Sequence, residues 1–156
     1  MKLLFESVNV IEGWKPATMG SGAASDWVNL TNYAGALAVI TITQGHASEG
    51  DITVDKATTA AGGGNSDGIT VKHLWSNVDT PTGDWTKATA AAAFNTSATG
   101  SGSSLYVLDI PAADLGEGYN FFQVNLASSS ASNISACVII PYGARYPQAQ
   151  PLDATV

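Results

Sequence analysis

The stretch GALAVITITQ, residues 35–44, decides the fold class, because it carries five β-branched residues in succession from Val39 to Thr43. Side chains of this kind fit the pleated surface of a sheet and lose rotamer freedom in a helix. Successive side chains of a strand point to opposite faces, so Ile40 and Ile42 share one face. The stretch therefore predicts a β-strand that packs one face against a hydrophobic core.

The same two-residue period recurs along most of the chain. DITVDKAT (51–58) alternates Ile52 and Val54 with polar residues, which predicts one buried and one solvated face. GITVKHLWSN (68–77) alternates as well, and one side of it carries Ile69, Val71, His73 and Trp75. Further expected strands are LLFESVNVI (3–11), LYVLDI (105–110), YNFFQVNLA (119–127) and ISACVII (134–140). The pattern predicts an all-β protein of about 7–8 antiparallel strands.

Two segments between the strands have some helical character. PAADLGEG (111–118) opens with Pro and closes with Gly, which predicts a short helical turn near 111–116. In TKATAAAAF (86–94) the alanines favour a helix, whereas the flanking Thr residues and a nearby Gly-rich loop favour an edge strand. We favour the strand.

The length and composition fit one domain. A chain of 156 residues can bury roughly 68–70% of the surface that it exposes when unfolded. Only 12% of the residues are charged, so side chains that would cover exposed helix faces are scarce. We expect a single β-sandwich or jelly-roll-like domain over 1–156, with extended segments at 1–10 and 141–156.

Charge and hydropathy exclude several classes of partner. The chain has 13 acidic and 6 basic residues, a net charge of -7, and its Lys and Arg are scattered singly. Nucleic acid is not expected as a partner, because phosphate binding needs a clustered positive patch. No apolar run reaches 18 residues, so no membrane span is expected. Glu6 interrupts the apolar N-terminus, and we expect no secretory signal.

The titratable residues predict no catalytic, metal or cofactor site. His46 lies in a turn and His73 among apolar strand residues, with no second ligand at metal-binding spacing, so we expect His73 to be a hydrogen-bonded core residue. Cys137, in ISACVII, is expected to pack as a small hydrophobe. No nucleophile motif accompanies the many Ser and Asp residues. We therefore expect a protein that is not an enzyme and needs no cofactor.

The aromatic residues are more informative. In YNFFQVNLA the residues Phe122, Val124 and Leu126 share one face, while Tyr119 and Phe121 lie on the other. Apolar groups on both faces indicate that both faces are covered. The cover is either another chain or the protein's own loops and N-terminal arm. Exposed aromatic residues are expected at Trp14, Trp27 and Trp85, near strand or loop ends.

The order of these segments resembles the small head proteins of tailed bacteriophages, which include capsid decoration (cement) and minor capsid proteins. The resemblance covers most of the chain. It is carried by the strand order, by DIPAADL (109–115) preceding an aromatic strand, and by the terminal ARYPQ (144–148).

The resemblance implies a structural virion protein that binds the outer surface of the capsid lattice and stabilises the head without catalysis. Its partners would be the major capsid protein and further copies of itself, as a trimer rather than a dimer. The protein would be made in the host bacterial cytoplasm and reside on the capsid exterior. Candidate interface residues are Tyr119, Phe121, Leu3, Phe5, Tyr142, Arg145 and Tyr146. The alternatives are a minor tail or baseplate protein, and a carbohydrate-binding sandwich whose Trp residues stack on sugar rings.

Overall fold

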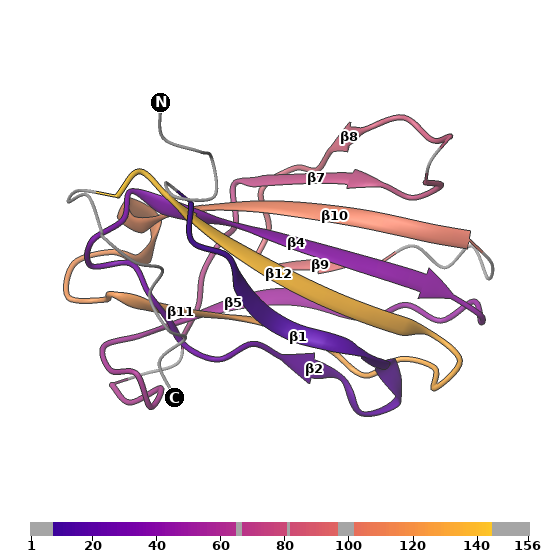
Figure 1. The fold of residues 1–156 in the computed structure, drawn as a ribbon, viewed down its shortest axis with the longest axis horizontal. Helices are drawn as coiled ribbons and strands as arrows, with labels where there is room; N and C mark the ends of the chain where they lie inside the picture. Colours follow the sequence, from indigo (N-terminus) through magenta and orange to yellow (C-terminus); the bar gives the residue numbers. More distant parts are fainter. Residues whose placement is uncertain (1–7, 65–66, 81, 97–101, 145–156) are drawn as a thin grey trace.

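The computed structural model describes residues 8–64, 67–80, 82–96 and 102–144, which form two antiparallel sheets packed face to face (Figure 1). Sheet A has the order β1-β12-β4-β10-β7-β8, and sheet B has the order β2-β11-β5-β6, with β3 paired to β11 and β9 to β5. The strands of sheet A are β1 (Ile11–Thr18), β4 (Gly35–Gln44), β7 (His73–Asn77), β8 (Thr86–Lys87), β10 (Gly102–Pro111) and β12 (Ile134–Tyr142). Those of sheet B are β2 (Ala23–Ala24), β3 (Val28–Asn29), β5 (Asp51–Ala57), β6 (Asp67–Gly68), β9 (Ala93–Asn95) and β11 (Phe121–Leu126).

The predicted β-sandwich is confirmed. Seven of the described strands have five or more residues, which agrees with the expected 7–8. Two short 3-10 helices, η1 (Met19–Ser21) and η2 (Ala112–Leu115), interrupt the strands. The second is the helical turn predicted near 111–116, and it is closed by Gly116, whose φ of 85° favours glycine.

The core fills the space between the two sheets. Ile40 and Ile42 of β4 point inward from sheet A and are 0% and 1% exposed, as the alternation of GALAVITITQ predicts. From sheet B, Val54, Phe122 and Val124 are each 0% exposed. Full burial of one such side chain stabilises the fold by roughly 1.5–3 kcal/mol relative to its exposure. The two-residue period of the strands thus directs apolar side chains into the core, where their burial stabilises the fold.

The segment GITVKHLWSN is not the single strand that its alternation predicts. Ile69 and Val71 are buried, but the chain passes here from sheet B, where Gly68 pairs with β5, to sheet A, where β7 begins at His73. The crossing resets the alternation, so Leu74 is 2% exposed and Trp75 43% exposed. The prediction that Trp75 shares a face with Ile69 and Val71 is therefore wrong.

The ends of the outer segments also differ from the prediction. Residues 8–10 of LLFESVNVI adopt no regular structure, and β1 begins only at Ile11, opposite Ile139. This register turns Ile11 inward and leaves Val10 51% exposed. Strand β12 continues through Tyr142, so its last two residues belong to the segment expected to be extended from 141.

TKATAAAAF contains no helix. Strand β8 in sheet A and strand β9 in sheet B occupy its two ends, so the preference for a strand is confirmed at both ends. Residues 88–92 carry the chain from one sheet to the other.

One buried polar side chain joins two loops at an end of the sandwich. Asn133 is 0% exposed, and its Oδ1 accepts hydrogen bonds from the backbone N–H groups of Gly45 (3.0 Å) and His46 (2.9 Å). Its Nδ2 donates to the carbonyl of Ser48 (3.2 Å) and to Ser129 Oγ (3.1 Å). The amide thus connects the loop before β12 to the turn after β4.

We expect Asn133→Ala to lower the free energy of unfolding by about 2–4 kcal/mol, because two backbone N–H groups lose their acceptor. The matched control is Ser132→Ala at the exposed neighbouring position, which should change stability by less than about 0.5 kcal/mol. Urea denaturation monitored by tryptophan fluorescence measures both. Equal midpoints for the two variants would contradict a role for the amide in holding these loops.

Candidate protein-binding face

The outer face of sheet A is apolar across its central strands. Strands β12, β4 and β10 bury every second residue, and the alternate residues point away from the core. We call these outward side chains, together with the exposed Trp75 of β7, the sheet A face. Its large aliphatic and aromatic members over these strands include Leu37, Val39, Trp75, Leu105, Val107, Ile134, Val138 and Ile140.

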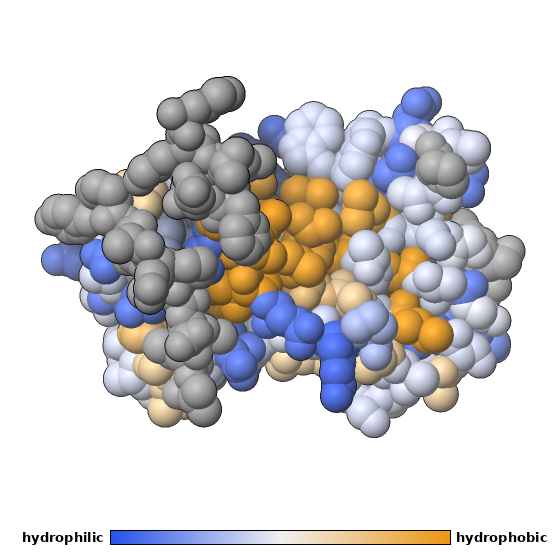
Figure 2. Space-filling model, in the orientation of Figure 1, coloured by the Kyte–Doolittle hydropathy of each residue, from blue (hydrophilic) through white to orange (hydrophobic). Residues whose placement is uncertain are grey.

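Three members of the sheet A face are strongly exposed: Trp75 at 43%, Ile134 at 46% and Val138 at 38%. The central ones are half-buried, because neighbouring strands flank them on both sides. Figure 2 shows the apolar side chains as a continuous orange area over β12, β4 and β10. An apolar area of this kind is typical of surfaces that bind another protein, a membrane or a ligand.

The register of the strands aligns one row of side chains across the whole sheet. Val39 pairs with Val107 on one side and with Val138 on the other. Val107 pairs in turn with Trp75. The row ends at two charges, since Glu12 pairs with Val138 and Lys87 pairs with Trp75. We call this the central row; across the sheet it reads Glu12, Val138, Val39, Val107, Trp75 and Lys87.

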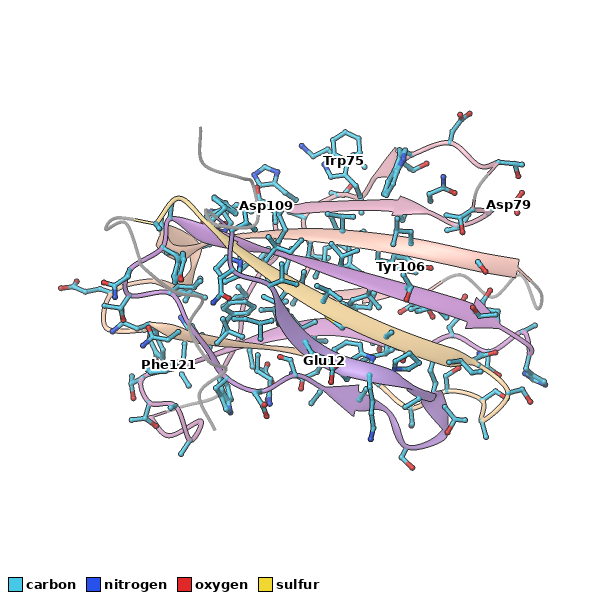
Figure 3. All side chains as sticks on the ribbon, viewed as in Figure 1. Glu12, Trp75, Asp79, Tyr106, Asp109 and Phe121 are labelled. Carbon is cyan, nitrogen blue, oxygen red and sulfur yellow. The ribbon has the colours of Figure 1, made fainter. Side chains whose placement is uncertain are left out.

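Both ends of the central row belong to the outer face. Ile11 packs against the core, so Glu12 points outward beside Val138. Lys87 Nζ lies 5.8 Å from the centroid of the Trp75 ring, within range of a cation–π contact. Figure 3 labels Glu12 on β1 and Trp75 on β7, at opposite sides of the sheet. The central row therefore ends in one acidic side chain on β1 and one basic side chain on β8.

A polar cluster bounds the sheet A face where β4 begins. The hydroxyl of Tyr142 donates to Asp109 Oδ1 at 2.7 Å, across the position of Gly35. A Cβ at Gly35 would lie 2.5 Å from Tyr142 Oη, so glycine leaves the room in which the ring lies. Burial, the hydrogen bond and the negative charge of Asp109 raise the pKa of Tyr142 from 10.0 to about 12. His73, opposite Asp109 on β7, is half-buried.

The outer face of sheet B differs, because polar side chains occupy its centre. Gln123 Nε2 donates to the carbonyl of Ser25 at 2.6 Å, and Asn125 Nδ2 donates to Asp55 Oδ2 at 2.8 Å. These groups bond to one another within the sheet. The sandwich thus has one polar and one apolar outer face.

Tyr119 and Phe121 do not form one continuous face. Tyr119 precedes β11 and packs against the core, with Lys56 Nζ 4.2 Å from its ring centroid. It lines a hollow of about 300 Å³ beside η2. Phe121 lies half-buried at the start of β11, paired with Ala57 and Asn29. The sequence leaves open whether another chain or the protein's own segments cover Tyr119. The structure shows that the protein's own residues contact it.

The other predicted site residues are dispersed. Tyr142 lies at the border of the sheet A face, whereas Leu3, Phe5, Arg145 and Tyr146 lie outside the described residues. Trp85 is 48% exposed, as expected.

The two remaining tryptophans are half-buried rather than exposed. Trp14 packs against the core, and its Nε1 donates to Ser135 Oγ at 3.1 Å. Trp27 lies so close to Gly62 that a Cβ there would be 2.7 Å from Trp27 Nε1.

Residues 8–64, 67–80, 82–96 and 102–144 contain no group of three or more His, Cys, Asp or Glu side chains that could hold a metal ion. His46 is exposed, with Nδ1 2.9 Å from Ser48 Oγ. Cys137 is buried, and its burial raises the pKa of the thiol from 9.0 to about 12. Within the same ranges, no helix has the length and apolarity to cross a membrane.

Sequence reasoning missed the sheet A face, although a signal for it exists. In LYVLDI, Leu105 and Val107 alternate with Tyr106 and Leu108, so both faces of the strand are apolar. ISACVII and GALAVITITQ show the same feature. Such a strand has a second side that also needs cover.

Comparison with known proteins finds no matching family model and no matching curated protein. Similar solved structures include the SPBc2 prophage-derived protein YomS, at 11% identity and a TM-score of 0.45, over 86% of this chain and 93% of that one. A second is the arabinosyltransferase EmbB from Mycobacterium smegmatis, at 20% identity and a TM-score of 0.28, over 88% of this chain and 13% of that one. At TM-scores below 0.5, neither likeness indicates a function.

The Cys137 thiol should react with DTNB at pH 8 at least ~100-fold more slowly in the folded protein than in urea, because burial disfavours the thiolate. The raised pKa also fixes how the free energy of unfolding depends on pH. As the pH rises, the unfolded chain loses the thiol proton before the folded protein does. The stability that depends on the neutral thiol is therefore present below pH 9.0 and is lost as the pH rises to about 12. Cys137→Ala should reduce the alkaline loss of stability. Rapid labelling of the folded protein would contradict the buried placement.

Proposed function

We propose that this protein is a structural component of a tailed-phage particle, which binds the outer surface of the capsid lattice as a decoration protein and stabilises the head without catalysis. The observation that carries the proposal is the sheet A face. Its apolar side chains extend over β12, β4, β10 and β7. They are not needed to fill the core, because the inward side chains of sheets A and B already do so. Such a surface suits a protein that works by assembling with other protein chains.

The charge of the chain supports an external position. With a net charge of -7, the protein would be repelled by packaged DNA and would not displace the cations that neutralise its phosphates. The resemblance of the segment order to phage head proteins supports the same assignment. We infer that the major capsid protein is the partner to which the assembled decoration protein binds.

The proposed stabilisation comes from many weak contacts. A standard interface buries roughly 1,200–2,000 Å² in total. A decoration protein that contacts neighbouring capsomers at once raises the effective concentration of each contact, and the resulting avidity would hold the shell against internal pressure. A rigid sandwich suits this role, because little order has to be gained on binding.

One observation favours a second candidate, a carbohydrate-binding module. Trp75 and Trp85 are 43% and 48% exposed and lie near one another in sequence around the β7–β8 hairpin. Exposed indole rings can stack on the apolar faces of sugars. A glycan array separates the two candidates, since a decoration protein should give no hits and a sugar-binding module should give hits that are lost in Trp75→Ala and Trp85→Ala.

We expect purified protein, mixed with undecorated capsids of the phage that encodes it, to add regular density to the outside of the shell in electron cryo-microscopy. The decorated capsids should also release DNA at a higher temperature than undecorated ones, because the added contacts must break first. Capsids incubated with buffer alone are the control. Bare shells at saturating protein would contradict the decoration role, and density on the tail would instead support a tail or baseplate protein.

A further inference from the structure

We propose that the sheet A face binds a second copy of this chain, across a two-fold axis that runs parallel to the strands of sheet A between β4 and β10. The inference rests on the proposed assembly role and names one partner for it. The described residues carry three arguments for a second copy: the charges at the ends of the central row, the shapes along it, and its area.

The charges at the two ends of the central row are complementary between two copies. The central row begins at Glu12 on β1 and ends at Lys87 on β8, with only apolar residues between. A two-fold axis along the strands reverses the row, so Glu12 of one copy faces the partner's Lys87, and the reverse pair forms at the other edge. A two-fold axis along the row would instead oppose like charges. The charges therefore select one of the two simple face-to-face arrangements.

The side chains of two copies also match in shape along the reversed row. Trp75, the largest exposed side chain of the row, would lie over the partner's Val138, which is 38% exposed. At the centre, Val39 would lie over the partner's Val107. One large aromatic residue at one side of the row and smaller β-branched residues along the rest of it allow two copies of one face to interdigitate.

The geometry of sheet packing is compatible with the charge pairs. Strands lie about 4.8 Å apart, so Glu12 and Lys87 are ~24 Å apart in one chain and each is ~12 Å from the proposed axis. Packed sheets lie about 10 Å apart and cross at roughly 30°, which tilts the axis ~15° from the strands and shifts the ends of the two rows sideways by only ~6 Å, so that the paired Cα atoms lie ~12 Å apart. Glutamate and lysine side chains are long enough to bridge that separation.

The sheet A face is also large enough for a dimer interface. Strands of 8–10 residues in β1, β12, β4 and β10, together with the shorter β7 and β8, give a footprint of roughly 700 Å² at standard strand dimensions. A standard interface buries about 800 Å² on each partner. The Tyr142–Asp109 pair lies at one end of the face, and Thr43 and Ser103 lie at the other. An apolar centre with polar ends is the usual anatomy of an interface.

The symmetry also bears on the oligomer. A face that contacts its own copy is isologous and generates a two-fold dimer, whereas a trimer joins two different surfaces of each subunit. The self-complementary row thus favours a dimer, in place of the trimer that the family resemblance implies. A dimer would present each capsid-binding surface twice, which strengthens the avidity of the proposed decoration role.

The test is a zero-length carbodiimide cross-link on the full chain without capsids. A carboxylate and an amine ~24 Å apart in one chain cannot be joined directly, so a Glu12–Lys87 cross-link found by mass spectrometry must connect two copies. We expect it in a dimer band. Sedimentation equilibrium should show Glu12→Lys and Lys87→Glu each weakening dimerisation roughly tenfold, because two surface ion pairs become repulsive. The double variant should recover to within about threefold of the original chain.

Glu117→Lys is the matched control, since it makes the same charge change at an exposed site before β11 and outside the sheet A face; it should leave dimerisation unchanged. The proposal is overturned by a monomer at 100 μM, by cross-links that join other surfaces, or by Glu12→Lys behaving like Glu117→Lys. A chain that dimerises only without residues 1–7 or 145–156 would assign the face to its own ends and also overturn it. A dimer that leaves capsids bare would contradict the decoration role alone, and capsids decorated by monomers would contradict this inference alone.

Discussion

The hydrogen-bonded ladder on the two sides of β4 is the constraint on which the rest of the structure depends. β4 pairs with β10 from Gly35 to Gln44 and with β12 from Gly35 to Thr43, so its backbone is held on both sides. Because side chains alternate strictly along a strand, the register that turns Ile40 and Ile42 into the core also turns Val39 outward between Val107 and Val138. The filled core and the apolar outer face are thus two consequences of one pairing. A slip of one residue would exchange them.

Local patterns in the sequence were enough to predict most of the strands and the helical turn. The faces of some side chains and their neighbours across the sheet depend on long-range strand pairing, which local patterns do not indicate. Alternation located the strands around Ile40, Ile52 and Phe122, and the Pro and Gly of PAADLGEG located η2, because these signals depend on neighbouring residues only. The alternation of GITVKHLWSN predicts the wrong face for Trp75, because the chain changes sheets between Gly68 and His73. The alternation within a segment does not indicate which strand it pairs with. The central row could not be predicted for the same reason, since its six residues come from six different strands. Tyr119 and Phe121 drew attention as aromatics on a second face, yet Tyr119 is covered by the protein's own segments.

The two outer faces differ in whether their side chains find partners within the same chain. On sheet B, polar side chains such as Gln123 and Asn125 bond to groups of the same sheet. On sheet A, valines and isoleucines cannot be satisfied by such bonds and lose contact with water only when another surface covers them. The proposed structural role in an assembly accords with this asymmetry, and the proposed two-fold contact would remove it.

The central claim is that the sheet A face, and not the sheet B face, is a protein-binding surface. The most direct measurement is sedimentation equilibrium from 1 to 100 μM on two variants, with circular dichroism as the check of folding. Val107→Lys changes the centre of the sheet A face. Thr53→Lys changes a half-buried position in the polar face of sheet B. The account predicts that the original chain and Thr53→Lys associate alike, while folded Val107→Lys stays monomeric, because its ammonium would be buried against apolar groups. Association of Val107→Lys with the strength of the original chain would contradict the account.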